Sequence, residues 1–445
     1  FSRLNMVSSF NLSSYLLLMF LFFFLISIFT FPSLEFQLSK QYGPVFSLQM
    51  GLQKMVVLTG YETVKEALIN QVDAFAERPF VPILEEFSNG FGIIVSHGEN
   101  WKVMRRFALT TLRDYGMGKR SIEDKIAEEC KVLIKKFESY QGKPFETTTI
   151  INAAVANIIV SILLGKRFEY EDPTFQRLLQ LVNENVRLFG SPSVMTLLKN
   201  RDDPWLLTIF YACGCLSLQF IELVVFCSRS SRRTGYFHKE NLKHVVGNLF
   251  AAGVETTSTT LRWGLLLMMK YPKIQKKVQA EIDDVVGTAQ PRTEHRIRMP
   301  YTDAVVHEVQ RFADIIPTNL PHATTTDVTL KGYFVPKGTH VIPLLTSVLH
   351  DESQWEKPHE FYPEHFLDSA GKFVKRDAFM PFSAGRRICA GETLAKMELF
   401  LFFTSLLQRF TFQPPPGTSR EDLDFTRAIG LTTPPLPFHI CALSR

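Results

Sequence analysis

The pattern of hydrophobic and polar positions predicts a mainly helical chain. Apolar residues recur at helical spacing over several long stretches, which we expect to form helices at Trp101–Ile134, Phe145–Val160, Tyr236–Lys270, Ile274–Val285 and Glu392–Arg409. Tyr271-Pro272 ends the third stretch, because proline cannot continue a helix. A shorter helix is predicted at Glu62–Ile69.

Strand patterns are short and predict only a small sheet. Val45–Leu48 and Met55–Leu58 flank Gly51 and favour a β-hairpin. Pro336-Lys337-Gly338, between apolar runs, favours the turn of a second hairpin within Asp327–Pro343. Phe425–Cys441 is typical of a hairpin interrupted by prolines. No internal repeat is visible, so we expect one large domain that is mainly α with minor β (α+β).

An uncharged apolar run, Tyr15–Phe31, precedes this domain. As a helix it would span roughly 26 Å, enough to cross a thin bilayer. A cleaved signal peptide is the competing interpretation, but Pro32-Ser33-Leu34-Glu35 follows Phe31 in place of a small-residue cleavage site. We therefore expect residues 1–32 to form an uncleaved N-terminal membrane anchor, and residues 33–445 to form the domain.

Charge and cysteine usage narrow the class of protein. The 445 residues carry a net charge of +5, and the basic residues are dispersed, which argues against a nucleic-acid partner. The six cysteines lack the regular spacing of a secreted disulfide framework. We therefore expect the domain to lie on the cytosolic side of the membrane.

The segment FSAGRRICAG, residues 382–391, carries the strongest chemical signal. A single cysteine is more often a packing residue, but Cys389 lies between Gly385 and Gly391, which permit tight bends and let amide groups point at a sulfur. Phe382 would shield a thiolate, and Arg387 suits a carboxylate. This setting suits a haem iron bound by thiolate, a ligand that favours cleavage of an O–O bond.

The segment resembles the Phe-x-x-Gly-x-Arg-x-Cys-x-Gly signature of the cytochrome P-450 haem-thiolate monooxygenases, matching all five fixed positions. Other stretches are similar to the microsomal family 2, in particular its fish-type subfamily K. The resemblance implies the cytochrome P-450 fold and a haem b with Cys389 on the iron. It also implies insertion of one oxygen atom of O₂ into a lipophilic small molecule of the xenobiotic, fatty acid or steroid class, with electrons from NADPH.

A second motif, Ala252-Gly253-Val254-Glu255-Thr256, places glycine in mid-helix, where it costs about 1 kcal/mol against alanine. It resembles the family's Ala-Gly-x-Asp/Glu-Thr motif. That resemblance implies that Gly253 leaves room for O₂, Thr256 holds a water and Glu255 relays protons, a general-acid task. The alternative is that these hydroxyls bond back to the preceding turn, which we expect for Thr257.

Further matches imply structural and cofactor-binding roles. Glu308 and Arg311 resemble the family's Glu-x-x-Arg pair, with His365 of Pro363-Glu364-His365-Phe366 where arginine is usual. The resemblance implies contacts to the haem propionates from Trp101, Arg105 and His322, although His322 taken alone would be an ordinary loop histidine.

The resemblance also implies surfaces for substrate and for an electron donor. The residues expected to line an apolar substrate pocket are Ala251, Ala252, Ile316, Asn319, Leu320, Leu431 and Thr432. The basic residues expected to dock NADPH-cytochrome P-450 reductase, with cytochrome b5 as a second candidate donor, are Lys102, Arg106, Arg113, Lys119 and Arg386. A run of charges is otherwise usually a solvated face.

Residues 186–235 depart from the family pattern. They include Trp205–Cys227, an apolar run long enough for a second membrane span. We interpret the segment as the product of a splice variant or a faulty gene model, with a genuine membrane re-entry as the other reading.

The expected protein is therefore a monooxygenase anchored in the endoplasmic reticulum membrane. A membrane-bound haem protein without turnover is the alternative. A haem-thiolate isomerase is disfavoured by the Glu255-Thr256 pair and the basic face.

Overall fold

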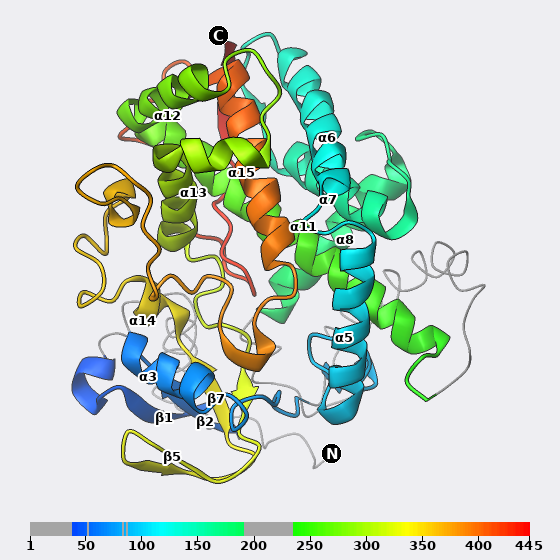
Figure 1. Ribbon diagram of the computed structural model, residues 1–445, viewed down its shortest axis with the longest axis vertical. Coiled ribbons are helices and arrows are strands. Elements are labelled where there is room, and N and C mark those ends of the chain that lie inside the picture. The colour runs from blue at the N-terminus through cyan, green and yellow to red at the C-terminus, as the bar shows by residue number, and fades with distance from the viewer. Residues whose placement is uncertain (1–37, 51–52, 82–83, 86–87, 191–234) are drawn as a thin grey trace, which may run out of the picture.

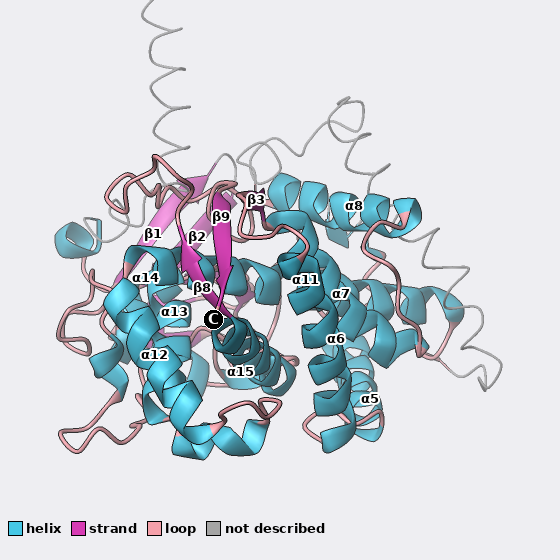
Figure 2. Ribbon diagram, turned by 90° about the horizontal axis from the view of Figure 1, so that it is seen from above, coloured by secondary structure: helices cyan, strands magenta, loops and turns pink. Residues whose placement is uncertain are grey.

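A long helix, α11 (Lys239–Lys270), runs through the middle of the molecule, and most other helices pack around it (Figure 1). This computed structural model describes residues 38–50, 53–81, 84–85, 88–190 and 235–445. The short helices and strands of residues 45–70 and 328–349 lie at one end of the helical body, and the C-terminus lies at the other. Figure 2 shows the labelled strands on one side of α11.

The other long helices are α5 (Gly98–Asp114), α6 (Arg120–Glu138), α7 (Thr148–Leu164), α8 (Pro173–Phe189), α12 (Pro272–Val285), α13 (Pro300–Ala313) and α15 (Glu392–Arg409). Short elements are α3 (Tyr61–Lys65), which continues as a π turn at Glu66–Asn70, α14 (Leu345–Leu349), and 3₁₀ turns at Thr293–Arg298, Pro363–Phe366 and Gly385–Arg387. The predicted helices at Tyr236–Lys270, Ile274–Val285 and Glu392–Arg409 are confirmed within a few residues.

The helical stretch predicted at Trp101–Ile134 is two helices, α5 and α6. Gly116 and Gly118, with φ of 102° and 77°, break it, because this left-handed backbone cannot continue an α-helix. The stretch predicted at Phe145–Val160 begins with a short strand, β3 (Phe145–Glu146), before α7 starts at Thr148.

The largest sheet has the strand order β1 (Val45–Met50), β2 (Gln53–Leu58), β7 (His340–Pro343), β4 (His322–Ala323). The first two strands form the predicted antiparallel hairpin, and β7 joins β2 in parallel. A second sheet has the order β3, β9 (His439–Ser444), β8 (Phe410–Gln413). Because β7 lies between β2 and β4, the four-stranded sheet brings the N-terminal quarter of the chain beside residues beyond 320.

The second predicted hairpin exists, but its turn is elsewhere. β5 (Val328–Leu330) and β6 (Tyr333–Val335) pair around Lys331-Gly332, whose φ angles of 49° and 83° suit a tight two-residue turn. A turn is also present at Pro336–Gly338, where Thr339 N–H donates to the Pro336 carbonyl at 3.3 Å. It leads from β6 into β7, which do not pair with each other, so the prediction that it closes the hairpin was wrong. In the C-terminal segment, Ala428 N–H donates to the Pro434 carbonyl at 2.8 Å, while β9 pairs with β8 and β3.

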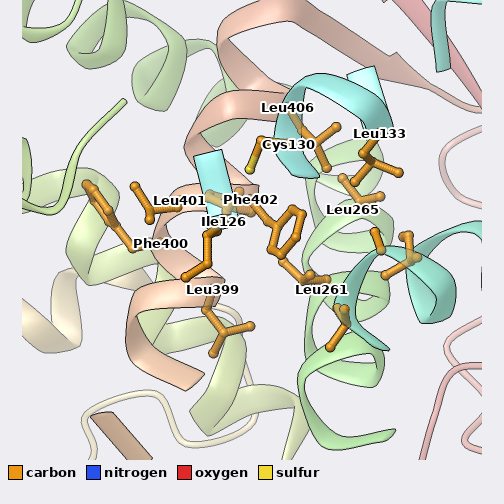
Figure 3. Packing of buried hydrophobic residues seen from close by; sticks show 14 of the residues in the cluster. Ile126, Cys130, Leu133, Leu261, Leu265, Leu399, Phe400, Leu401, Phe402 and Leu406 are labelled. Carbon is orange, nitrogen blue, oxygen red and sulfur yellow. The ribbon is translucent and has the colours of Figure 1, made fainter. Parts of the chain in front are cut away.

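The main hydrophobic core lies where α6, α7, α11 and α15 meet. Figure 3 shows side chains of α6 between those of α11 and α15, with Ile126, Cys130, Leu133, Leu261, Leu265, Leu399, Phe402 and Leu406 among them. Residues 397–407 of α15 are buried without interruption, as expected for a helix segment that is surrounded by other helices. This packing fixes the helix that follows Cys389 against the helix that carries Glu255 and Thr256.

Among the helices in the described ranges, we find none with the length and apolar character needed to cross a bilayer. The expected anchor within residues 1–32 and the run Trp205–Cys227 lie outside the described residues.

Candidate active site

Cys389 lies in a tight loop between the 3₁₀ turn Gly385–Arg387 and the start of α15. Its backbone N–H donates to the Phe382 carbonyl at 3.0 Å. Gly385 has φ 78°, and a Cβ there would lie 2.2 Å from the Leu68 carbonyl oxygen, so only glycine fits. Gly391 precedes α15, and a Cβ there would be in ordinary contact with the Cys389 sulfur, 3.9 Å away.

The surroundings of the Cys389 sulfur suit a metal ligand. Burial raises the pKa of the thiol, opposed by the backbone N–H groups of Gly391 and Glu392 and by the Arg105 guanidinium. The residue nevertheless keeps an exposed surface, which a large planar ligand could cover. A coordinated metal cation would deprotonate the thiol outright.

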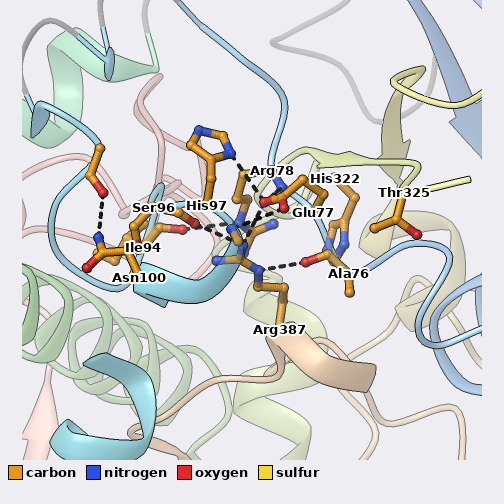
Figure 4. Close-up of polar contacts among 12 residues, drawn as sticks. Ala76, Glu77, Arg78, Ile94, Ser96, His97, Asn100, His322, Thr325 and Arg387 are labelled. Atoms are coloured by element: carbon orange, nitrogen blue, oxygen red, sulfur yellow. Dashed lines mark hydrogen bonds and ion pairs between the residues drawn. The ribbon is translucent and has the colours of Figure 1, made fainter. Parts of the chain in front are cut away.

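Arg387 lies at the centre of a buried polar cluster beside this loop (Figure 4). Its Nε donates to the Ala76 carbonyl at 2.8 Å, and its Nη2 donates to the Ser96 carbonyl at 2.9 Å and to Glu77 Oε1 at 3.1 Å. The guanidinium also stacks on the Trp101 ring, 3.8 Å from its centroid. Burial lowers the pKa of Arg387 to about 10, against the effect of Glu77, so the group stays cationic at neutral pH.

Three buried polar atoms around this cluster have no hydrogen-bond partner within the described part of the chain: Trp101 Nε1, Arg387 Nη1 and His322 Nε2. Leaving a buried donor unpaired costs about 1–3 kcal/mol, so such atoms normally have a partner. Carboxylate oxygens would accept from the first two directly. The residues present therefore fit the propionates of a haem.

His322 needs a proton to take part as a donor. Its Nδ1 lies 2.7 Å from the Phe75 carbonyl, which can only accept, so the neutral ring carries its hydrogen on Nδ1 and Nε2 is an acceptor. Burial, with Arg78 nearby, lowers the pKa of His322 to about 3. A carboxylate beside Nε2 would favour the protonated ring.

Arg78 belongs to the same cluster, although its sequence context did not reveal it. Its side chain is buried, and Nη1 donates to the Leu320 and Pro321 carbonyls at 2.9 and 2.8 Å. Burial, with Arg387 and Arg105 nearby, lowers the pKa of Arg78 to about 9. Arg105 itself donates to the Ile388 carbonyl, just before Cys389. Three arginines thus concentrate positive charge beside the Cys389 loop, which suits a dianionic ligand.

Glu77 is a second residue that the sequence did not reveal. Its carboxylate accepts from Arg387, from the backbone N–H of Arg78 at 2.9 Å and from His97 Nδ1 at 3.2 Å. Burial opposes ionisation, but these donors together lower the pKa of Glu77 to about 2. His97 also contacts Glu85, and the two carboxylates raise its pKa. Glu77 is therefore ionised at neutral pH, and its carboxylate orients the Arg387 guanidinium.

On α11, the two predicted proton-handling residues face different ways. Thr256 is half-buried and its hydroxyl donates to the Ala252 carbonyl at 2.7 Å, the ordinary back-bond of a helical threonine. Glu255 is buried, and its Oε1 accepts from Thr259 at 3.2 Å and from Thr432 at 2.8 Å. Gly253 lets α11 pack closely against α7, because a Cβ at this position would lie 2.7 Å from the Ile159 side chain.

Comparison with known proteins decides the family. A sequence model described as Cytochrome P450 matches residues 15–211 and 217–442. The chain belongs to the cytochrome P450 family. Cytochrome P450 2K4 of Oncorhynchus mykiss is 51% identical, with 92% of this chain and 86% of that protein covered. Cytochrome P450 2K6 of Danio rerio is 48% identical over the same shares, and cytochrome P450 2C5 of Oryctolagus cuniculus is 45% identical over 91% and 88%.

Membership establishes the general chemistry. The chain is a cytochrome P450 monooxygenase, whose cofactor is a haem held by a cysteine thiolate and whose reaction uses O₂ and electrons derived from NADPH. The family match leaves out residues 212–216, which lie inside the segment 186–235 that we expected to be atypical.

Glu308 and Arg311 form an ion pair on α13, and both side chains are fully buried. Arg311 donates to both carboxylate oxygens of Glu308, at 2.7 and 2.8 Å, and to the Leu349 and Pro358 carbonyls. His365 Nδ1 lies 3.2 Å from Glu308 Oε2. The pair thus ties α13 to the chain between α14 and the turn that contains His365.

Of the seven expected pocket residues, five keep partial exposure or more: Ala251, Ala252, Ile316, Leu320 and Leu431. The other two are buried and hydrogen-bonded. Asn319 Nδ2 donates to the Ser383 hydroxyl at 2.9 Å, which links its loop to the Cys389 loop. Thr432 donates to Glu255. Asn319 and Thr432 therefore have polar partners within the protein, and neither side chain is exposed as the other five are.

All five residues of the expected docking face are exposed: Lys102, Arg106, Arg113, Lys119 and Arg386. Arg386 pairs with Asp73 at 2.7 Å, and Lys102 pairs with Glu99 at 3.5 Å. Arg386 and then Lys102 lower the pKa of Asp73, so the two cations lie on one surface. Solvent-exposed pairs of this kind contribute little to stability, which leaves the cations free to exchange partners.

Thr257, for which we expected an ordinary back-bond, instead donates across to Glu398 Oε2 on α15 at 3.1 Å. Glu398 is 1% exposed, and burial raises its pKa to about 8. The sequence offered no signal for this contact, because the two residues lie on different helices.

Proposed function

We propose that Cys389 is the thiolate ligand of the haem iron in this chain. The observation that carries the proposal is the set of buried, unpartnered atoms of Trp101, Arg387 and His322, within the described residues, beside the Cys389 loop. When bound, the haem supplies the iron at which O₂ is activated. Arg387, Trp101 and His322 would hold its propionates, and Arg78 and Arg105 would add positive charge beside them.

The proposed reaction inserts one oxygen atom into a lipophilic substrate RH: RH + O₂ + NADPH + H⁺ gives ROH + H₂O + NADP⁺. The second oxygen atom leaves as water, so protons must reach the site. Thr256, on the partly open side of α11, and Glu255 behind it are the groups that would move these protons. Partly exposed apolar side chains, among them Ile316, Leu320 and Leu431, suit a substrate of the xenobiotic, fatty acid or steroid class.

The proposed electron donor is NADPH-cytochrome P-450 reductase, with cytochrome b5 as a second donor. Exposed cations on α5 and on the Cys389 loop would steer an acidic flavoprotein to the thiolate side. The proposed location is the endoplasmic reticulum membrane, with the catalytic domain in the cytosol. The apolar run Tyr15–Phe31, which is long enough to cross a thin bilayer, supports this proposal.

The test is reconstitution of the full chain with haem, reductase and NADPH in lipid vesicles. The reduced carbon monoxide complex should give the Soret band of a thiolate-bound haem, and a lipophilic alkoxycoumarin should be dealkylated in an NADPH-dependent manner. Cys389→Ser should lose both, whereas the matched variant Cys441→Ser should keep them. A thiolate-type band that survives in Cys389→Ser would refute the ligand, and the band without turnover would favour a haem protein that lacks activity.

A further inference from the structure

We propose that Thr432 is a positioning residue for proton delivery, because its hydroxyl holds the carboxylate of Glu255. This inference rests on the proposed role of Glu255 and names a residue that acts through it. Thr432 comes from the C-terminal segment, 177 positions from Glu255, and was expected from the sequence to face the substrate.

The contact is short, buried and directional. Thr432 Oγ1 donates to Glu255 Oε1 at 2.8 Å, and the two residues are 3% and 7% exposed. Thr259, one turn along α11, donates to the same oxygen at 3.2 Å. A hydrogen bond to a charged acceptor in a poorly hydrated site is among the stronger ones, so the two hydroxyls fix one end of the carboxylate.

The backbone on both sides of Thr432 is held in place by contacts that do not involve Glu255. Trp263 Nε1 donates to the Thr433 carbonyl at 3.0 Å, and Arg262 donates to the Pro435 carbonyl at 3.0 Å, so the segment is fastened along α11. Leu431 N–H donates to the Val186 carbonyl of α8 at 3.0 Å. The donor is therefore pre-organised before the carboxylate meets it.

The placement matters because Glu255 and Thr256 are neighbours that face different sides of α11. Thr256 lies beside the exposed Ala252, whereas Glu255 points into the protein. Arg262, on the same helix, is a charged group that this carboxylate influences: burial lowers the pKa of Arg262, and the carboxylates of Glu146 and Glu255 oppose that effect. With Oε1 fixed by Thr432 and Thr259, Oε2 is the end of the carboxylate that can exchange a proton.

Two substitutions separate the hydroxyl of Thr432 from its bulk. Thr432→Val keeps the shape but removes the donor, and Thr432→Ser keeps the donor but removes the methyl group. Thr433→Val is the matched control, because the Thr433 hydroxyl points to the Asp314 carbonyl at 3.2 Å instead. Each variant is first checked for the thiolate-type Soret band, and Thr432→Ala replaces Thr432→Val if the latter fails that check.

The measurement is dealkylated alkoxycoumarin formed per NADPH consumed, together with the hydrogen peroxide released. We expect Thr432→Val to lower this coupling ratio roughly 3-fold or more, a part of the 10²–10⁴ that a positioned general acid supplies. Thr432→Ser and Thr433→Val should stay near the unmodified chain. Turnover driven by cumene hydroperoxide, which arrives with its oxygen already reduced, should be unchanged in Thr432→Val, whereas a damaged pocket would lower it as well.

A double-mutant cycle with Glu255→Gln tests the role of Glu255 separately from the role of Thr432. We expect Thr432→Val to have no further effect in the Glu255→Gln background, because both changes act on one carboxylate. If Glu255→Gln alone leaves coupling unchanged, the proposed role of Glu255 is overturned and that of Thr432 with it. If Glu255→Gln lowers coupling but Thr432→Val does not, or if their effects add, only the role of Thr432 is overturned.

Discussion

At the scale of single residues, the cluster beside Cys389 combines side chains that each solve a different problem. Arg387 is cationic and held by two carbonyls, Trp101 supports it from one side, and Glu77 orients it from the other. Such a fork of fixed donors cannot be replaced by a lysine, whose compact ammonium stacks less well on an aromatic ring and does not hold its donors in a rigid plane. Because Arg387 lies beside the Cys389 loop, where we propose that haem binds, this difference is measurable.

We predict that Arg387→Lys weakens haem retention by about tenfold, corresponding to the loss of roughly 1.4 kcal/mol from charge-assisted hydrogen bonds. Haem transfer to apomyoglobin, followed by absorbance, measures the effect. Arg386→Lys is the matched control, since Arg386 is exposed and its partner Asp73 is also at the surface. Equal haem loss from the two variants would contradict the assignment.

At the scale of elements, two buried carboxylates join helices in opposite ways. Glu308 is paired with Arg311 and supports the loop after α14. Within the described ranges of the chain, Glu398 accepts a hydrogen bond only from the Thr257 hydroxyl, across the α11–α15 contact. The first is stabilised as an ion pair, whereas burial keeps the second neutral up to a pH of about 8. Substitution of each should therefore have a distinct signature.

Glu308→Ala should destabilise the fold by about 3–5 kcal/mol, because it leaves the fully buried Arg311 guanidinium without its counter-ion. Urea denaturation followed by circular dichroism measures the change. Glu240→Ala removes an i,i+3 partner of Lys243 from a more exposed pair on α11 and should cost less than about 1 kcal/mol. Similar costs for the two variants would show that the Glu308 pair is not a structural lock.

Glu398→Gln should stabilise the protein at pH 8 but not at pH 4.5. The pKa of Glu398 is raised to about 8 in the fold, so as pH rises from about 4.5 the unfolded chain loses this proton while the folded chain keeps it, and stability falls. The amide does not titrate and avoids this loss, which should exceed about 1 kcal/mol by pH 8. Thermal unfolding from pH 4.5 to 8 tests it, and a pH-independent difference between the two proteins would disprove the burial effect.

At the scale of the whole molecule, the chain on either side of residues 191–234 belongs to one core. Phe175 and Val182 of α8 and Phe250 and Leu261 of α11 are buried in the same cluster, and Leu431 is hydrogen-bonded to Val186. Two segments packed into one core must lie on the same side of a membrane. In a membrane-bound protein, the described residues on either side of 191–234 would therefore lie on the same side of the membrane.

We predict that tags inserted at Lys199 and Arg233 are accessible to protease from the same side of microsomal vesicles. The unmodified N-terminal run Tyr15–Phe31 serves as the reference for the membrane-bound fraction. The protein must retain its thiolate-type Soret band in the same preparation, so that only folded chains are scored. Protection of one tag and digestion of the other would contradict a single core.

Much of this fold and site follows from short stretches of sequence. The helix boundaries of α11, α12 and α15 follow from local periodicity and from Pro272, because helical hydrogen bonds join residues only four apart. The glycines, arginine and cysteine of residues 382–391 are also contiguous, and Gly385 has the positive φ that its loop needs. Local chemistry of this kind is readable without a structure.

Only the tertiary structure decided which distant groups meet. Arg78 and Glu77 lie about 310 positions before Arg387, and they join the cluster because the sheet brings both ends of the chain together. On α11, Glu255 is bonded to Thr432, 177 positions away, and Thr257 is bonded to Glu398, 141 positions away. No periodicity encodes such pairs, since they depend on how helices and strands pack. The sequence by itself determined the residues of the Cys389 loop and the helices, and packing decided the charges and hydrogen bonds that surround them.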